Sequence, residues 1–242
     1  MMWKLYSLLA AAAMLFGLSG CGTTAKFVYP AQMSSLAQID SAPVTEKTLA
    51  VLPFDDYRSD ANDAMFGMYL IPLMPFGWGT YERPDAASMF LSITAYDITP
   101  SEDLAKAAAV SFRHSNLFKD VFFTFGGEKS NADFILKGRL KVMRYRGKVF
   151  SYGLSIEGPL LWFLGAPAGT SENQLALELT LCNKDGKVLW DWSMDKEDWM
   201  VQWLYARMGY DCRLFTSMYQ DGMNDAVNSL AKKMREQPEL FR

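Results

Sequence analysis

The sequence predicts an α+β fold, in which a mixed sheet of about five strands and two main helices form a two-layer sandwich. Residues 49–52 form a continuous apolar run that ends at a proline, which is typical of a strand buried on both faces. Residues 133–144 and 175–194 alternate between apolar and polar side chains, as strands with one wet face do. Apolar residues at helical spacing indicate helices over residues 99–116 and 223–234.

The two alternating segments define the centre of the predicted sheet. Residues 175–194 hold two alternating runs around an Asp-Gly pair, Asp185 and Gly186, and this arrangement predicts a β-hairpin. In residues 133–144, Gly138 interrupts the alternation but does not shift it. The side chains expected to share one face of that strand are Phe134, Leu136, Leu140 and Val142.

Local signals place the ends of the helices. Thr99 is expected to cap the first helix, with Pro100 at its first position and Glu102 completing a capping box. Pro238 is expected to stop the last helix, because proline cannot continue one. Residues 198–208 are a further candidate for an amphipathic helix.

The first 20 residues have the pattern of a secretory signal. Lys4 gives a positive start, residues 5–18 are almost continuously apolar, and small residues precede Cys21. The apolar stretch is too short to span a membrane comfortably as a mature helix. The ending Leu18-Ser19-Gly20-Cys21 resembles the lipobox of bacterial lipoproteins, in which the signal is cut before the cysteine and the cysteine is lipid-modified. A plain secretory signal with a chance cysteine is the alternative.

The lipobox resemblance implies a localisation and a division of the chain. Gly22, rather than an aspartate, follows Cys21, which in lipoproteins of enteric-type bacteria favours the outer membrane, usually its periplasmic face. Residues 1–20 would be removed, and residues 21–47 would supply the lipidated cysteine and a flexible tether. Residues 48–242 would form a single α/β domain. The membrane is therefore an expected partner through Cys21.

Composition limits the classes of protein. The chain of 242 residues has a formal net charge of -3, and 50% of its residues are hydrophobic and 14% aromatic. This composition predicts a packed core rather than disorder, and it excludes a basic nucleic-acid-binding protein. Besides Cys21 there are Cys182 and Cys212, which could form a disulfide in an oxidising compartment or remain two buried thiols.

Two segments, residues 65–79 and 152–169, are apolar, aromatic and interrupted by glycine and proline. Apolar loops of this length are unusual, because exposed loops are normally polar. They could pack on each other and cover the second face of the sheet, form an exposed patch for a protein partner or subunit, or dip into a lipid surface. Glu157 argues against deep insertion. The candidate interaction surface consists of Leu70, Ile71, Met74, Phe76, Trp78, Leu160, Leu161, Trp162 and Phe163.

Residue types suited to catalysis or metal binding are scarce. The single histidine, His114, stands without a catalytic context, and histidine and cysteine together are too few for an ordinary zinc site. Two acidic groupings invite calcium binding or glycoside hydrolysis, but they fit a solvated loop and the wet face of a strand better. These are Asp55, Asp56, Asp60 and Asp63, and then Asp191, Asp195, Glu197 and Asp198. We therefore expect no enzyme, no catalytic residue, no metal and no cofactor.

The order of elements resembles a known group of domains. Residues 49–54, read as Leu-Ala-Val-Leu-Pro-Phe, the junction at residues 115–121 and the strand at 132–140 are similar to the TolB amino-terminal-like α/β domain. That domain occurs in bacterial envelope lipoproteins, including the curli-secretion pore subunit and activators of cell-wall synthases. The two apolar segments depart from the simple domain and are closer to those of uncharacterised proteobacterial lipoproteins.

This resemblance implies a binding or assembly component of the envelope, such as an adaptor, a secretion accessory or an activator of another envelope machine. A self-assembling ring is the alternative, as the pore-forming relative implies. A glycan-acting enzyme is less favoured. The expected partner is a protein of the envelope or a second copy of the chain, and not a nucleic acid.

Overall fold

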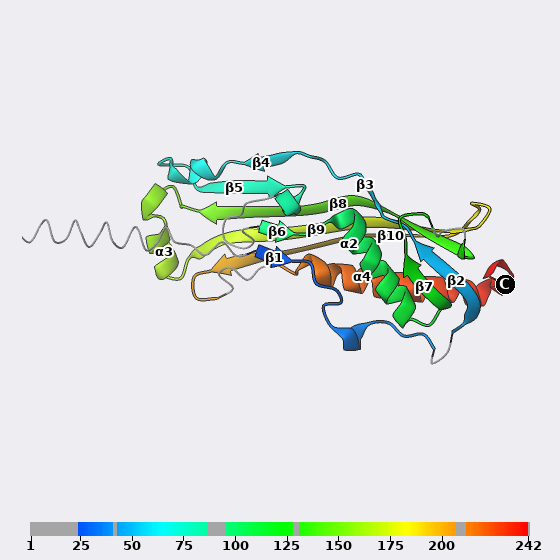
Figure 1. The fold of residues 1–242 in the computed structure, drawn as a ribbon. Helices are drawn as coiled ribbons and strands as arrows, with labels where there is room; N and C mark the ends of the chain where they lie inside the picture. Colours follow the sequence, from blue (N-terminus) through cyan, green and yellow to red (C-terminus); the bar gives the residue numbers. More distant parts are fainter. Residues whose placement is uncertain (1–23, 41–42, 87–94, 128–130, 207–211, 242) are drawn as a thin grey trace, which may run out of the picture.

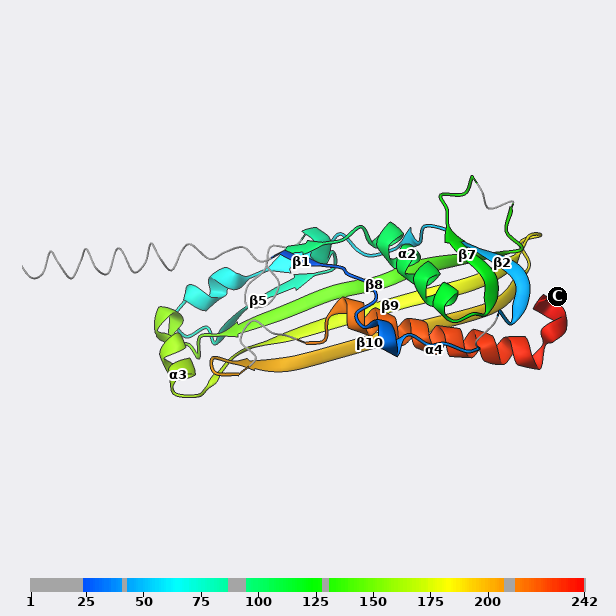
Figure 2. The same cartoon turned by 60° about the horizontal axis from the view of Figure 1, so that its bottom comes forward.

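The computed structural model describes residues 24–40, 43–86, 95–127, 131–206 and 212–241. Over these residues the protein is α+β, with a mixed sheet of eight strands and two long helices packed on it (Figures 1 and 2). The predicted fold class is confirmed. The predicted number of about five strands is too low, because the additional strands are short and lie in segments rich in aspartate, glycine or proline.

Three long antiparallel strands run the length of the molecule (Figure 1). They are β8 (Phe134–Phe150), β9 (Pro167–Asn183) and β10 (Val188–Trp203), in the order β10-β9-β8. At one end of β8, β2 (Thr45–Val51) pairs with it in parallel, and β7 (Phe118–Phe123) pairs in parallel with β2. This end of the sheet therefore has the mixed character that the sequence predicts.

The other end of β8 has different neighbours. There β5 (Phe76–Tyr81) pairs with β8 in antiparallel fashion, and β4 (Asn62–Ala64) pairs with β5. Between the two ends, β3 (Asp55–Asp56) pairs with β8 in parallel. A separate two-stranded sheet joins β1 (Thr24–Lys26) to β6 (Ala95–Asp97).

A β-bulge changes which side chains of β8 face the core. The register against β9 shifts between Leu140 and Val142. Leu140 is fully buried, but beyond the bulge Met143 and Tyr145 take the buried positions and Val142 is only half-buried. The predicted direction of Val142 is therefore wrong, because one extra residue turns every later side chain to the other face.

The hairpin of β9 and β10 is confirmed and is longer than predicted. The amide oxygen of Asn183 closes its turn by accepting the backbone N–H groups of Asp185 (3.1 Å) and Lys187 (2.9 Å). Pairing continues along both strands as far as Trp203 opposite Pro167. The predicted helix over residues 198–208 is therefore wrong up to Trp203, because backbone pairing with β9 outweighs its helical spacing.

Two long helices, α2 (Pro100–His114) and α4 (Phe215–Glu236), pack on the sheet and complete the core. Pro100 occupies the first turn of α2 as predicted, but the capping box does not form. The carboxylate of Asp103 accepts the backbone N–H of Thr99 (2.7 Å), whereas Glu102 pairs with Lys106 (2.7 Å). None of the helices in the described ranges is long and apolar enough to cross a membrane.

The remaining helical segments are short. Those near the chain ends and loops are η1 (Met33–Ser35), η3 (Pro84–Ala86) and η6 (Pro238–Phe241). Three others form one end of the molecule: η2 (Phe66–Leu70), η5 (Ser155–Glu157) and α3 (Pro159–Phe163).

Part of the expected tether packs on the domain. The rings of Phe27 and Tyr29 stack on each other and meet Tyr219 of α4 edge-on. The hydroxyl of Tyr29 hydrogen-bonds to that of Ser111 in α2, and Leu36 is buried. Apolar burial outweighs the disorder that the two prolines suggest. The described part of residues 21–47 thus contacts α2 and α4, and in the sequence Gly22 and Thr23 lie between Cys21 and β1.

Candidate functional site: an apolar tip

Both apolar segments lie at the same end of the long sheet (Figures 1 and 2). η2 precedes β5, and η5 and α3 connect the end of β8 to the start of β9. We call the surface formed by residues 65–75 and 152–166 the apolar tip. The sequence predicts each segment, but only the pairing of β5 with β8 brings the two together.

The two segments of the apolar tip hold each other through backbone carbonyls. The N–H of Leu73 donates to the carbonyl of Gly153 (2.9 Å), and the hydroxyl of Ser155 donates to the carbonyl of Leu70 (2.6 Å). Gly158 lies so close to the backbone of Ser151 that an added Cβ would be 2.6 Å from its Cα. The tip is therefore a defined structure of short helical turns rather than a pair of loose loops.

A small core of its own supports the apolar tip. Val149, Trp162 and Ala168 are buried together, apart from the main core. The indole N–H of Trp162 donates to the carbonyl of Phe150 (2.9 Å), and Tyr69 meets its ring edge-on. Mutual packing, the first of the three explanations for these segments, thus holds for their inner side chains.

The outer side chains of the apolar tip remain exposed. Within the predicted interaction surface, Trp162 is buried and Phe76, Trp78 and Leu161 are half-buried. The exposed members are Leu70, Ile71, Met74, Leu160 and Phe163. The sequence-based selection missed the two most exposed large hydrophobic residues, Leu73 (89% exposed) and Leu164 (83% exposed). Both lie inside the predicted segments, but periodicity could not identify their direction, because neither belongs to a regular element.

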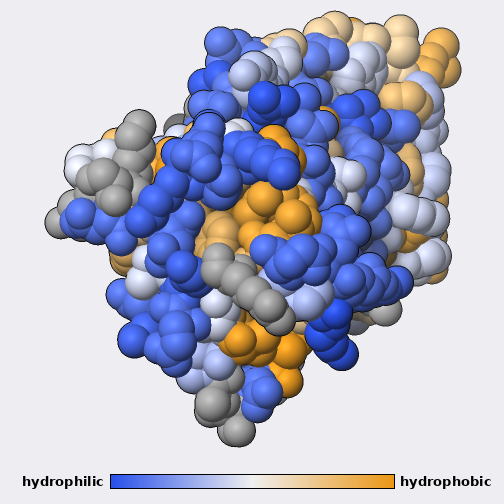
Figure 3. All heavy atoms as spheres, turned by 90° about the vertical axis from the view of Figure 1, so that its right-hand side faces the viewer, coloured by the Kyte–Doolittle hydropathy of each residue, from blue (hydrophilic) through white to orange (hydrophobic). Residues whose placement is uncertain are grey.

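The apolar tip is almost without charge. Residues 64–81 contain no charged side chain, and residues 149–171 contain one, Glu157. At the opposite end of the molecule the surface is mainly hydrophilic, with apolar patches between the polar side chains (Figure 3). The asymmetry between the ends is therefore a property of the whole molecule, and it marks the tip as the candidate contact surface.

Aromatic side chains with polar ends surround the apolar tip. The hydroxyl of Tyr152 donates to the carbonyl of Pro167 (2.6 Å), and the hydroxyl of Tyr205 donates to that of Phe163 (3.1 Å). Partial burial raises the pKa of Tyr152 above its ordinary value. Trp203 lies at the end of β10 beside the same rim and is partly exposed.

An open apolar cavity of about 340 Å³ lies between η2 and β8. Its lining residues are Phe66, Gly67, Tyr69, Leu70 and Val149. The cavity is open beside Gly67, since no atom lies within 4 Å of the position that a Cβ would take there. It belongs to the same apolar surface as the tip and could accept a hydrocarbon group.

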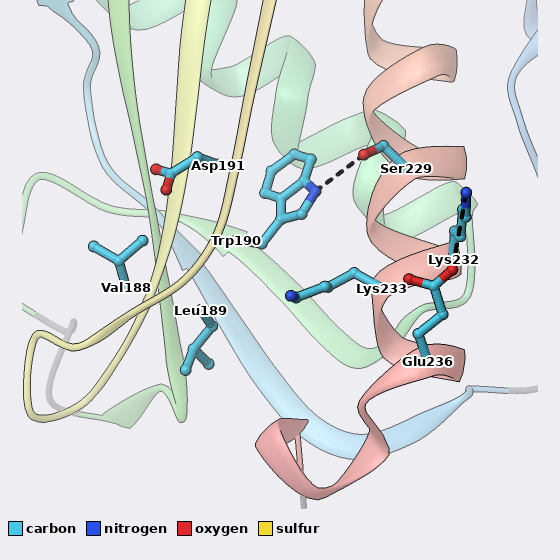
Figure 4. A pocket seen from close by; sticks show the side chains of 8 residues that line it. All are labelled: Val188, Leu189, Trp190, Asp191, Ser229, Lys232, Lys233 and Glu236. Carbon is cyan, nitrogen blue, oxygen red and sulfur yellow. Dashed lines mark hydrogen bonds and ion pairs between the residues drawn. The ribbon is translucent and has the colours of Figure 1, made fainter.

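A second hollow lies between the hairpin end of β10 and α4 (Figure 4). The indole N–H of Trp190 donates to the hydroxyl of Ser229 (3.1 Å), and Lys232 pairs with Glu236 (3.8 Å). Its volume is about 480 Å³, but charges of both signs line it, and they include Asp191 from the predicted acidic grouping. We assign this hollow to the docking of α4 on β10.

The acidic residues of the loop after β2 form ion pairs that stabilise the fold. Arg58 is almost completely buried and binds Asp56 and Asp85, each at 2.8 Å. Burial alone would raise the pKa of Asp56, but the hydrogen bonds and charge of Arg58 hold that pKa below its ordinary value. Asp60 pairs with Arg83 (2.6 Å), so the loop is fastened to the segment after β5. Among the described residues, no group of three or more His, Cys, Asp or Glu is placed to hold a metal ion.

The remaining predicted residues are distributed widely. Cys21 and the signal segment lie outside the described residues. Cys182 and Cys212 are buried and are not joined by a disulfide; one lies near the hairpin turn of β9 and the other just before α4. His114 is the last residue of α2, far along the chain from the segments of the apolar tip.

Comparison with known proteins gives a distant structural likeness. One solved structure, the PelC dodecamer from Paraburkholderia phytofirmans, has a TM-score of 0.39 and 15% identity, and covers 78% of this chain and 94% of that chain. A substituted variant of the same PelC, in another crystal form, has a TM-score of 0.37 and 14% identity, with 80% and 95% covered. No family model and no curated protein matches the chain. Values this low do not assign a family or a function.

Proposed function

We propose that this chain is a lipid-anchored, non-enzymatic binding or assembly protein of the bacterial cell envelope. Its acyl chains would be attached to Cys21, and the domain would face the periplasm from the outer membrane. The apolar tip would be its principal contact surface. A protein of this class works as an adaptor or an accessory of a larger envelope machine.

The observation that supports the proposal most directly is the exposed apolar tip. A domain that keeps Leu73 and Leu164 largely exposed, in segments nearly free of charge, has a surface suited to contact with another molecule or surface. The lipobox-like ending at Cys21 provides a reason for that contact to lie in the envelope. Stable anchoring usually needs more than one acyl chain, and lipoprotein processing supplies several on one residue.

The anchor is tested by Cys21→Ser, with Thr23→Ser as the matched control. We expect the wild type and Thr23→Ser to incorporate a labelled fatty acid and to be shortened by the signal segment. Cys21→Ser should lose the label and remain at precursor length, because the acyl acceptor and the cleavage site are both gone. Normal labelling and processing of Cys21→Ser would contradict the proposal.

A second candidate is a self-assembling ring, and one observation favours it. β10 forms an edge of the sheet over 16 residues and pairs, within the described part of the chain, with β9 alone. Such an edge can pair with another chain. Its exposed positions include the carboxylates of Asp191, Asp195 and Glu197, which would repel a similar edge. Light scattering of residues 22–242 distinguishes the two: a discrete large oligomer favours the ring, and a monomer favours the adaptor.

A further inference from the structure

The position of Cys21 in the chain indicates a membrane as the partner of the apolar tip. Cys21 lies three residues before Thr24, the first residue of β1, and three extended residues span at most about 11 Å. β1 runs away from the end of the molecule that bears α3, so its first residue is directed toward that end (Figure 1). β1 lies partway along the sheet, and the chain enters it from the side of the tip end of the domain and not from the hairpin end (Figure 1).

The chemistry of the apolar tip fits the upper part of a lipid leaflet. Its exposed side chains are aliphatic or phenyl groups on or beside short helical turns, and the turns satisfy part of their own backbone hydrogen bonding. The N–H of Leu161 donates to the carbonyl of Gly158 (3.0 Å), and that of Leu164 donates to the carbonyl of Leu161 (3.1 Å). Self-satisfied backbone groups lower the cost of leaving water.

The rim of the apolar tip fits the headgroup region. Tyr152, Trp203 and Tyr205 have apolar rings with polar ends, and such residues are enriched where protein crosses the membrane–water interface. The ammonium group of Lys148, at the tip end of β8, lies 5.4 Å from the centroid of the Phe76 ring and supplies a cation beside the same rim. Glu157 limits the depth, because a carboxylate is costly in the hydrocarbon region.

We propose that the apolar tip inserts at interfacial depth into the lipid leaflet that holds the acyl chains of Cys21. The inference rests on the proposed function, since a lipidated Cys21 is what would hold the domain next to that leaflet. Two contacts, the acyl chains and the tip, then fix the orientation of the domain, whereas an acyl anchor alone would leave it free to turn.

The test places an environment-sensitive fluorophore on single introduced cysteines in the lipidated protein. Leu73→Cys and Leu164→Cys label the tip, and Phe125→Cys labels an equally accessible apolar position after β7, at the other end of the sheet. The native Cys182 and Cys212 are 4% and 1% exposed, so they should not react in the folded protein. Each labelled protein is reconstituted into phosphatidylethanolamine–phosphatidylglycerol vesicles, with and without spin-labelled lipid.

We expect the labels at residues 73 and 164 to shift to shorter wavelength on vesicles and to lose more than about half of their emission to spin-labelled lipid. The label at residue 125 should keep its emission in both conditions. Water-like emission from both tip labels, while the protein remains bound to vesicles, would overturn the inference and leave the anchor intact. A blue shift that needs no vesicles and grows with protein concentration would also overturn it, because a second copy would then cover the tip.

The same preparation separates this inference from the proposed function. Protein that lacks acyl chains and does not stay on the vesicles contradicts the lipid anchor itself, and the inference fails with it. Protein that stays on the vesicles through Cys21 leaves the tip labels as the only variable. The labels therefore report the tip alone in that case.

Discussion

At the scale of single residues, close packing explains positions that sequence patterns leave open. Gly138 interrupts an alternating strand, and the structure gives the reason: the ring of Phe54 crosses β8 at that point. A Cβ at position 138 would lie 2.4 Å from the nearest ring carbon of Phe54. Phe54 itself is almost completely buried, and the hydroxyl of Ser101 donates to its carbonyl (2.5 Å). The glycine is therefore required by its neighbour rather than by its own backbone.

Gly138→Ala is expected to lower the free energy of unfolding by about 1–3 kcal/mol, because overpacking forces a buried ring to move. Chemical denaturation of residues 22–242 measures the change. The double variant Gly138→Ala with Phe54→Leu should recover part of the loss, because the smaller side chain makes room. A single variant as stable as the wild type would show that Phe54 does not occupy this position.

Tyr29 gives a pH-dependent test of the packing of the N-terminal segment. Burial raises its pKa from 10.0 to about 12, although the hydrogen bond with Ser111 acts in the opposite direction. The phenol therefore stabilises the fold fully below pH 10, and this contribution is lost as the pH rises from 10 to about 12.

Tyr29→Phe removes the ionisable group and one hydrogen bond, which contributes about 1 kcal/mol at neutral pH. We expect the wild type to be the more stable protein at pH 8, with the difference shrinking or reversing toward pH 12. Denaturation curves at several pH values measure it, and Tyr57→Phe, at an exposed position, is the control. A difference that does not change with pH would mean that Tyr29 is not buried.

At the scale of elements, the strands with strict alternation could be predicted and the short ones could not. Leucines at every second position and an Asp-Gly turn sequence predict the hairpin of β9 and β10. β5 could not be predicted, because Gly77 and Gly79 are residues typical of loops. In the structure both glycines lie against Phe66, where a larger side chain would not fit. The end of β10 has helical spacing, but pairing with β9 decides its structure. Signals that depend on a distant partner cannot be read from local sequence.

The candidate site, too, could be predicted only in part from the sequence. The composition of the two segments identifies the apolar tip, because glycine, proline and continuous apolar residues are visible in the sequence. Its geometry is not visible, since Trp162 turns inward while Leu164 turns outward within three positions. The contact between Leu73 and Gly153, which unites the two segments, depends on the register of β5 against β8.

The segment before β2 offers a test at the same scale. Three backbone N–H groups there have partners in the domain: that of Gln32 donates to Gln220 (3.0 Å), that of Ala37 to Asn224 (2.8 Å) and that of Ile39 to Ser115 (3.0 Å). We expect amide hydrogen exchange to be slowed at these positions, because exchange requires the bond to open.

Hydrogen exchange followed by mass spectrometry, on residues 22–242, measures this protection. Asn224→Ala should speed exchange at Ala37 and leave Ile39 unchanged, which provides an internal control. Exchange within seconds over the whole of residues 27–40 in the wild type would mean that this stretch is a free tether after all.

At the scale of the whole molecule, the length of the sheet separates two different ends. A strand of 17 residues, such as β8 or β9, extends over about 55 Å. With the apolar tip at the membrane, the mainly hydrophilic end seen in Figure 3 would stand roughly that far into the periplasm.

In the proposed function, the mature protein begins at a lipidated Cys21. The most direct measurement is the intact mass, with fragmentation of the N-terminal peptide, of the protein purified from bacterial membranes. We expect the signal segment to be absent and acyl chains to be attached to Cys21. An N-terminal peptide that begins elsewhere, or an unmodified Cys21, would contradict the account and would remove the basis for placing the apolar tip in the lipid.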